Sequence, residues 1–199
     1  MEENVFEEMA KRYDNAERQR VADIIAEKVL SVLPDATHKT LIDYGSGTGL
    51  VSLQLAPHVA SVVLVDASQQ MLDIAAKKIK RQQIENATVH YADFTKGMPN
   101  IQADIVFLSL VLLHIPDTAL ILKNLATMLP TGGQLYVVDF DENARVSHPK
   151  VHSGFNHAQL NKQLQTAGFE QVHINNFYAG EKMFINEDAV LFLAQAVKK

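Results

Sequence analysis

Three glycines at alternate positions and an aspartate further along the chain have the clearest chemical meaning in this sequence. Gly45, Gly47 and Gly49 follow a short apolar run, and Asp66 closes the next apolar run, residues 61–65. Glycines permit a tight turn and let backbone amides approach a ligand, because they have no Cβ and adopt positive φ at little cost. An acidic side chain at the tip of a neighbouring parallel strand can accept hydrogen bonds from ribose hydroxyls. The pattern predicts a nucleoside pocket.

The spacing of the glycines separates two kinds of nucleoside ligand. A dinucleotide-binding loop reads G-x-G-x-x-G, and its last glycine opens a helix whose amides face a pyrophosphate. Here the third glycine comes one residue earlier, and Asp43 lies two residues before the first. The segment resembles motif I of the class I methyltransferases that use S-adenosylmethionine (SAM). In that family the loop passes under the amino-acid end of SAM and its sulfonium, and not under a phosphate.

The resemblance extends to residues that follow two later strands. In the family, the acid at the position of Asp93 accepts a hydrogen bond from the adenine amino group, although an acid in an ordinary turn would look the same in one sequence. Ser109 and Leu110 would line the floor of the pocket beside the sulfonium. Together, the resemblance implies the following cofactor-binding residues: Tyr13, Asp43, Gly45, Ser46, Gly47, Gly49, Asp66, Ala67, Met71, Asp93, Phe94, Ser109 and Leu110.

Tyr13 belongs to a segment, residues 6–14, that is similar to the N-terminal lids of small-molecule methyltransferases. In those lids an aromatic hydroxyl reaches the SAM carboxylate, and the segment covers the substrate. A lid would exclude water, which strengthens the electrostatics around a cationic methyl donor. Simple helix packing is the alternative explanation for this aromatic residue.

His114 and His152 are the candidates for a general base. Methyl transfer is an in-line displacement, so the protein mainly aligns donor and acceptor, and a base is needed only if the acceptor must lose a proton. A neutral histidine near pH 7 suits that role. We expect no metal site, because a proline and a glycine interrupt the segment that carries His148, His152 and His157, and the chain has no cysteine.

The elements that would position these residues alternate between strand and helix. The apolar patterns predict strands over residues 39–44, 61–65, 87–91, 104–110 and 134–139, and helices over residues 3–33, 50–55, 69–81 and from Asp117 to Pro130. The strand at 104–110 is almost wholly apolar, as expected of a central strand covered on both faces. This alternation predicts a doubly wound α/β fold with a parallel sheet and helices on both faces.

The C-terminal part breaks this alternation. A helix over residues 157–167 leads to a strand over 171–177, and another strand over 189–197 follows. The polar residues between these strands leave no room for a helix, which parallel neighbours usually need, so the two should pair antiparallel. This matches the Rossmann-like methyltransferase sheet, with seven strands in the order 3-2-1-4-5-7-6 and strand 7 antiparallel. A nicotinamide-dependent dehydrogenase would continue with a parallel sixth strand.

Length, net charge and apolar content limit the domain organisation, the partners and the location that we expect. The length of 199 residues fits one domain, which we expect to comprise a helical lid over residues 1–35 and an α/β core over 36–199. The net charge of -5 disfavours nucleic-acid partners, and the basic cluster at 77–81 is expected to face water at a helix end. No apolar run approaches the ~20 residues that span a bilayer, and the acidic N-terminus is unlike a signal peptide. A cytoplasmic location is therefore expected.

The sequence favours a SAM-dependent methyltransferase that acts on a small molecule. A non-catalytic SAM-binding sensor or partner protein is the main alternative, and the early third glycine disfavours a nicotinamide-dependent oxidoreductase. A cysteine nucleophile is excluded because the chain has none, and the segment 108–111 differs from the N/D-P-P-Y motif of amino-methylating nucleic-acid enzymes. The residues do not reveal the acceptor, the methylated atom or the oligomeric state.

Overall fold

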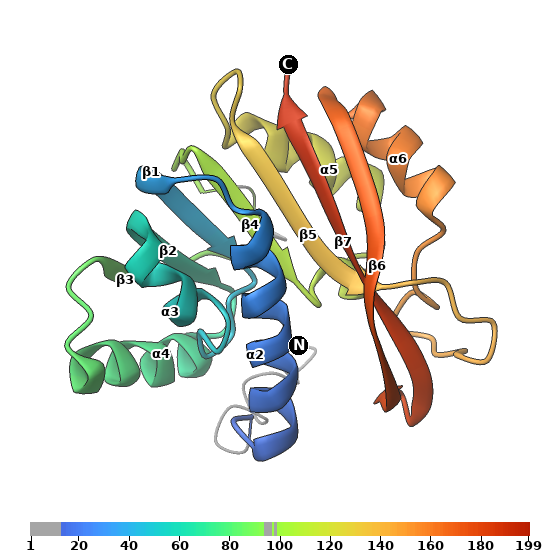
Figure 1. Ribbon diagram of the computed structural model, residues 1–199, viewed down its shortest axis with the longest axis horizontal. Coiled ribbons are helices and arrows are strands. Elements are labelled where there is room, and N and C mark those ends of the chain that lie inside the picture. The colour runs from blue at the N-terminus through green and yellow to red at the C-terminus, as the bar shows by residue number, and fades with distance from the viewer. Residues whose placement is uncertain (1–12, 94–96, 98) are drawn as a thin grey trace. The chain divides into compact units, whose positions relative to one another are not determined.

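The computed structural model describes residues 13–93, 97 and 99–199 (Figure 1). The chain divides into two compact units, Met1–Ile101 and Gln102–Lys199. The seven strands follow the order β3-β2-β1-β4-β5-β7-β6 in the sheet. This is the order expected from the sequence, so the predicted Rossmann-like α/β fold class is confirmed.

The first unit contains three parallel strands and the helices that connect them. The strands are β1 (Ala36–Tyr44), β2 (Val59–Asp66) and β3 (Ala87–Tyr91), and β2 pairs with both of the others. The helices are α2 (Ala16–Val32), the short α3 (Ser52–Leu55), its continuation η2 (Ala56–His58), and α4 (Gln69–Gln82). Because Tyr44 is opposite Val65, the loop after β1 starts beside the end of β2.

Local sequence explains where α4 begins and ends. The Ser68 side chain accepts a hydrogen bond from the Met71 amide, which caps the N-terminus. At the C-terminus Gln83 adopts a left-handed φ of 54°, and its amide bonds to two carbonyls of the last turn. One face of the helix is buried, through Met71, Leu72 and Ala75. The helix predicted over residues 69–81 is confirmed to within one residue.

The N-terminal helix is shorter than predicted. Residues 13–15 are not helical, and α2 starts only at Ala16. Asn15 sets this start, because its backbone is extended and its side-chain oxygen accepts a hydrogen bond from the Arg18 amide at 2.8 Å. The continuous helix expected over residues 3–33 is therefore wrong at 13–15, and its earlier part lies outside the described residues.

The second unit contains four strands, of which two pair antiparallel at the end of the chain. The strands are β4 (Ile105–Ser109), β5 (Gln134–Phe140), β6 (Phe169–Phe184) and β7 (Glu187–Lys198). The β4 and β5 pair is parallel, whereas β7 is antiparallel to both β5 and β6, as predicted. The helices are η3 (Leu112–His114), α5 (Thr118–Thr127) and α6 (His157–Thr166). Asp117 caps α5 by accepting a hydrogen bond from the Leu120 amide, which confirms the expected start of this helix.

The last two strands are longer than predicted and form a hairpin. They are joined by the two-residue turn Ile185-Asn186, in which both residues have positive φ, 50° and 64°. Positive φ at both central residues is typical of tight hairpin turns. The prediction missed this part because β6 is mostly exposed and polar near the turn, and because its register with β7 shifts three times. An irregular, solvated strand lacks the alternating apolar pattern that predicts strands.

Candidate cofactor site

The glycine loop after β1 is bent by three residues in the left-handed conformation. The φ values are 76° at Gly45, 53° at Gly47 and 76° at Gly49. The amides of Gly45 and Ser46 both donate to the Val65 carbonyl, at 2.8 and 3.0 Å, and tie the loop to the end of β2. Residues with a Cβ are disfavoured in this conformation, so the backbone of the loop requires glycine at these positions.

Gly47 and Gly49 differ in what surrounds them. A Cβ at Gly49 would lie 2.6 Å from Cδ2 of Leu64 and 3.1 Å from Cγ of Leu53, so the absence of a side chain lets the loop pack on the core. A Cβ at Gly47 would instead lie 3.8 Å from Cε1 of Tyr13. Gly49 therefore has a packing role, whereas Gly47 presents bare backbone toward Tyr13.

Asp66 connects the end of β2 to the glycine loop. Its Oδ2 accepts a hydrogen bond from the Gly47 amide at 2.7 Å, and its Oδ1 accepts one from the Ser68 amide at 2.8 Å. An ionised carboxylate has about four acceptor positions, so the Asp66 side chain can accept several hydrogen bonds at once. The amides of Gly45, Ser46 and Gly47 all donate within the protein. The loop thus contributes space and close approach to a ligand, and these amides are not the donors that the sequence suggested.

Two polar side chains of the loop region are buried. Asp43 is 3% exposed, and desolvation raises its pKa to about 7, against the effect of the Ser52 hydroxyl and with a smaller increase from Asp66. The Oγ atom of Ser46 is buried and has no hydrogen-bond partner among the described residues. Such a hydroxyl costs free energy unless a ligand supplies a partner, so its position fits a site for a polar ligand group.

Tyr13 faces the glycine loop from the segment before α2. The Arg18 guanidinium lies 4.4 Å from the centre of the Tyr13 ring, and Arg18 Nη1 donates to the Tyr13 carbonyl at 2.9 Å. Burial raises the pKa of the Tyr13 hydroxyl, Arg18 opposes this, and the carboxylates of Asp66, Asp14 and Asp43 raise it further. The hydroxyl is therefore protonated at neutral pH and can donate a hydrogen bond. Tyr13 lies outside α2, and the preceding part of the segment 6–14 lies outside the described residues.

The remaining predicted cofactor residues of the first unit follow β2 and β3. Ala67 comes directly after Asp66, and Met71 is buried in the first turn of α4. Asp93 follows β3, the strand that pairs with β2. Phe94 lies outside the described residues. The first unit therefore holds the loop, Asp66 and Asp93 at the carboxyl ends of three neighbouring parallel strands, where open α/β sheets bind ligands.

Ser109 is the last residue of β4 and Leu110 follows it; both belong to the second unit. Leu110 has a φ of 55°, a left-handed conformation that is uncommon for a leucine. Its amide donates to the Val138 carbonyl at 2.9 Å, which holds this conformation in place. Strained backbone of this kind is concentrated at functional sites, so the observation agrees with a site at this strand end.

The two candidate bases lie in one part of the second unit. The His152 amide donates to the Leu113 carbonyl at 2.9 Å, and its Nε2 lies 2.8 Å from the Ile115 carbonyl oxygen. Because a carbonyl only accepts, Nε2 carries a proton, and in the neutral ring Nδ1 keeps a lone pair. His114 is exposed, yet desolvation of its ring and, to a smaller extent, His148 lower its pKa. His114 is thus neutral near pH 7, as a base must be.

Asp139 accepts a hydrogen bond from this region, although the sequence analysis did not identify it as a candidate residue. It is the penultimate residue of β5, is fully buried, and accepts hydrogen bonds from the Leu113 amide at 3.1 Å and the Phe140 amide at 2.9 Å. Burial raises its pKa to about 7, while these amides and that of Leu112 oppose the increase. The sequence could have identified Asp139, because this aspartate follows an apolar run, as Asp66 does.

Lys78 was predicted incorrectly. It belongs to the basic cluster at 77–81, which we expected to face water, but its side chain is only 14% exposed. Its ammonium donates to the carbonyl of Thr48 within the glycine loop at 3.0 Å. The sequence offers no signal that separates Lys78 from its exposed neighbours Lys77 and Lys80, because helix position alone does not reveal an inward contact.

The histidines after β5 have separate partners. His152 bonds to the Ile115 carbonyl, His157 lies 3.4 Å from Asp141, and His148 accepts from the Lys150 amide. In the part of the chain that the structure describes, no three histidine, aspartate or glutamate side chains are grouped so that they could hold a metal ion.

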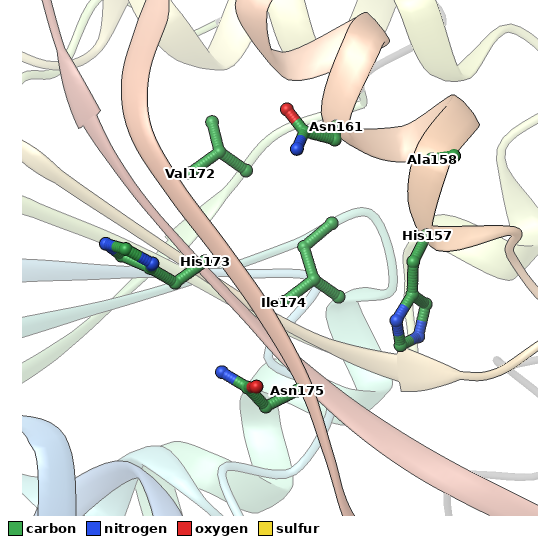
Figure 2. A pocket seen from close by; sticks show the side chains of 7 residues that line it. All are labelled: His157, Ala158, Asn161, Val172, His173, Ile174 and Asn175. Atoms are coloured by element: carbon green, nitrogen blue, oxygen red, sulfur yellow. The ribbon is translucent and has the colours of Figure 1, made fainter.

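A separate concavity lies between α6 and β6 in the second unit. Figure 2 shows its lining residues: His157, Ala158, Asn161, Val172, His173, Ile174 and Asn175. None of them was predicted as a cofactor or catalytic residue, and all belong to the unit that lacks the glycine loop and Asp66.

Comparisons with known proteins agree with the glycine loop and the strand order. Residues 35–183 match a family described as a methyltransferase domain. The chain belongs to the class I SAM-dependent methyltransferases.

Individual relatives are similar over part of their length. The chain is 33% identical over 106 residues to a ubiquinone biosynthesis O-methyltransferase of Coxiella burnetii, a match that covers 53% of this chain and 45% of that protein. The chain thus spans less than half the length of this methyltransferase relative.

Solved structures share the fold at lower identity. A phosphoethanolamine N-methyltransferase of Haemonchus contortus in complex with SAM has a TM-score of 0.73 at 15% identity, covering 99% of this chain and 60% of that one. A SAM-dependent methyltransferase of Aquifex aeolicus has a TM-score of 0.70 at 18% identity, covering 96% and 98% of the two chains.

Proposed function

We propose that this protein binds SAM at the glycine loop and Asp66 and transfers its methyl group to a small-molecule acceptor. The observation that carries the proposal is the 2.7 Å hydrogen bond from the Gly47 amide to Asp66, which brings the bare loop backbone and the ribose acceptor together. The adjoining Ser46 hydroxyl, buried without a partner in the described structure, supports a polar ligand at this place.

Each residue of the first unit has a distinct role in this proposal. Asp66 accepts hydrogen bonds from the ribose hydroxyls, and Asp93 accepts one from the adenine amino group. The protonated hydroxyl of Tyr13 donates to the carboxylate of the cofactor, and the Tyr13 segment excludes water from the site. Gly47 provides room for the ligand because it has no side chain. Ala67 and Met71 complete the walls of the pocket in this unit.

In this proposal the protein aligns the acceptor with SAM and, where needed, removes a proton from the acceptor. SAM supplies a methyl group on a sulfonium, which is a good leaving group. The chain aligns the acceptor with it and keeps water out. When the acceptor is a hydroxyl, Nδ1 of His152 or the neutral ring of His114 takes its proton.

A hydroxyl is the first acceptor class to test, because the relative in Coxiella burnetii is an O-methyltransferase. Calorimetry should detect SAM binding to the wild-type protein, and Asp66→Ala should remove it. Release of S-adenosylhomocysteine with a panel of phenols, amines and thiols then measures turnover. Binding of SAM without release for any acceptor class would favour a non-catalytic SAM-binding protein.

The proposal also includes the organisation and setting of the chain. We take residues 1–35 as a lid and 36–199 as the core of a single domain in a cytoplasmic enzyme with no nucleic-acid partner. The net charge of -5 supports the last point. No helix among the described residues has the length and apolar character needed to cross a membrane. Cell fractionation and a gel-shift assay with RNA and DNA test these points.

A further inference from the structure

Three side chains from different elements form a closed cycle of contacts beside the glycine loop. Nζ of Lys78, in α4, lies 2.7 Å from Oδ2 of Asp14 and donates to Oγ1 of Thr48 at 3.1 Å. Oγ1 of Thr48 in turn donates to Oδ1 of Asp14 at 2.6 Å. The Asp14–Thr48–Lys78 cycle therefore joins the segment before α2, the glycine loop and α4.

The cycle uses all the donors of its ammonium group. Lys78 has three N–H donors, and its partners are Asp14, Thr48 Oγ1 and the Thr48 carbonyl at 3.0 Å. The side chains of Lys78 and Asp14 are 14% and 35% exposed, and Thr48 is fully buried. Hydrogen bonds with ionised partners are stronger than neutral ones, and partial burial reduces their screening by salt. The cycle is thus a firmer connection than an ion pair on the open surface.

The cycle acts on the segment that carries Tyr13. Asp14 is the next residue after Tyr13, and Thr48 is the next residue after Gly47. The hydrogen bond between Asp14 and Thr48 therefore joins the two residues that directly follow Tyr13 and Gly47. Arg18 holds the same segment on its other side through the Tyr13 carbonyl. Lys78 is thereby bonded to the residue that follows Tyr13 in the chain.

We propose that Lys78 is a positioning residue that, through Asp14 and Thr48, holds Tyr13 and Asp14 beside the glycine loop and sets the rate at which SAM leaves. The inference rests on the proposed function, since SAM is the ligand concerned. Loss of the cycle frees the segment to move away from the loop while Asp66 and Gly47 stay in place. SAM then dissociates faster, while its association changes little, because changes within one site mostly affect dissociation.

Lys78→Met is the test variant, because it keeps the apolar stem and removes the charge, and Lys77→Met is its control on the exposed face of the same helix. The equilibrium constant for SAM is measured by calorimetry, and its dissociation rate by dilution of radiolabelled SAM complex into excess unlabelled SAM. Lys78→Met should raise the dissociation rate about tenfold, equivalent to about 1.4 kcal/mol, with Lys77→Met unchanged. Lys78→Arg should restore most of the retention, because the cation is kept.

Asp14→Asn tests the cycle from its other end, and the double variant shows whether the two residues act together. If they do, Asp14→Asn in the Lys78→Met background adds little further dissociation. A wild-type dissociation rate in both single variants, or fully additive effects, would overturn the role of Lys78. A lower melting temperature of Lys78→Met with normal SAM retention would do the same, because the residue would then serve folding alone. Failure of the wild-type protein to bind SAM would instead overturn the proposed function.

Discussion

Replacement of Gly49 by alanine is expected to destabilise the fold more than the same change at another left-handed glycine. At Gly49 the new Cβ would lie 2.6 Å from Cδ2 of Leu64 and 3.1 Å from Cγ of Leu53, both of which belong to buried residues. Gly132, in the turn before β5, is the matched control. Its φ of 81° is close to the 76° of Gly49, and no heavy atom of the described structure lies within 4 Å of its added Cβ.

Two separate costs determine the expected magnitude. A left-handed conformation costs an L residue about 1–2 kcal/mol, and this applies to both variants. Forcing a methyl group into a packed core costs about 1–3 kcal/mol more, and this applies only to Gly49→Ala. We therefore expect losses of about 3 kcal/mol for Gly49→Ala and about 1 kcal/mol for Gly132→Ala. For a chain of this size, these values correspond to decreases in melting temperature of about 9 and about 3 °C.

Urea unfolding followed by circular dichroism measures these losses, and thermal melts provide an independent value. Equal losses in the two variants would show that the glycine loop does not pack on Leu64, and would refute the reasoning. Gly47→Ala extends the comparison, because its Cβ would lie 3.8 Å from the Tyr13 ring and meets no clash. Its stability should resemble that of Gly132→Ala, whereas its affinity for SAM should fall.

Three further predictions concern carboxylates and the hairpin turn. Asp66→Ala should abolish SAM binding in calorimetry while the far-ultraviolet circular dichroism stays unchanged; retained affinity would remove Asp66 from the site. Asp43 and Asp139 have pKa values raised from 3.8 to about 7, so the folded protein keeps protons that the unfolded chain loses, and their contribution to stability decreases as pH rises from about 4 to about 7. Asp43→Asn and Asp139→Asn should each flatten the melting temperature over this pH range, and an unaltered slope would contradict the assigned burial. Ile185→Asn should raise stability by about 0.5–1 kcal/mol in urea unfolding, because Ile185 is exposed at a φ of 50° that asparagine tolerates better, and a loss would contradict the turn geometry.

The order of the strands and the glycine loop were predictable because they depend on local patterns. Apolar runs bounded by glycine or proline mark the parallel strands, and the spacing of Gly45, Gly47 and Gly49 follows from a backbone that needs three positive φ values. The antiparallel end of the sheet followed from chain length, because the segment between the last strands has no room for a crossover helix. These features require no knowledge of distant contacts.

Other features depend on contacts between residues that are far apart in the chain. Lys78 has the same local sequence context as its exposed neighbours, and only Asp14 and Thr48 make it different. The break before α2 depends on the Asn15 cap, whose signal is a single residue inside a helical pattern. The role of Asp139 beneath η3 required the position of the Leu113 amide. Sequence reasoning thus identified the bent glycine loop and missed the side chains that support it.

The irregular pairing of β6 has a consequence for how copies of this chain can associate. β6 is the outermost strand at its end of the sheet, and its register with β7 shifts between residues 170 and 173, 176 and 178, and 180 and 184. A neighbouring molecule that tried to extend the sheet would need a long, regular row of amides and carbonyls, and these bulges interrupt it. The strand therefore resists edge-to-edge aggregation in a crowded solution through its own bulges.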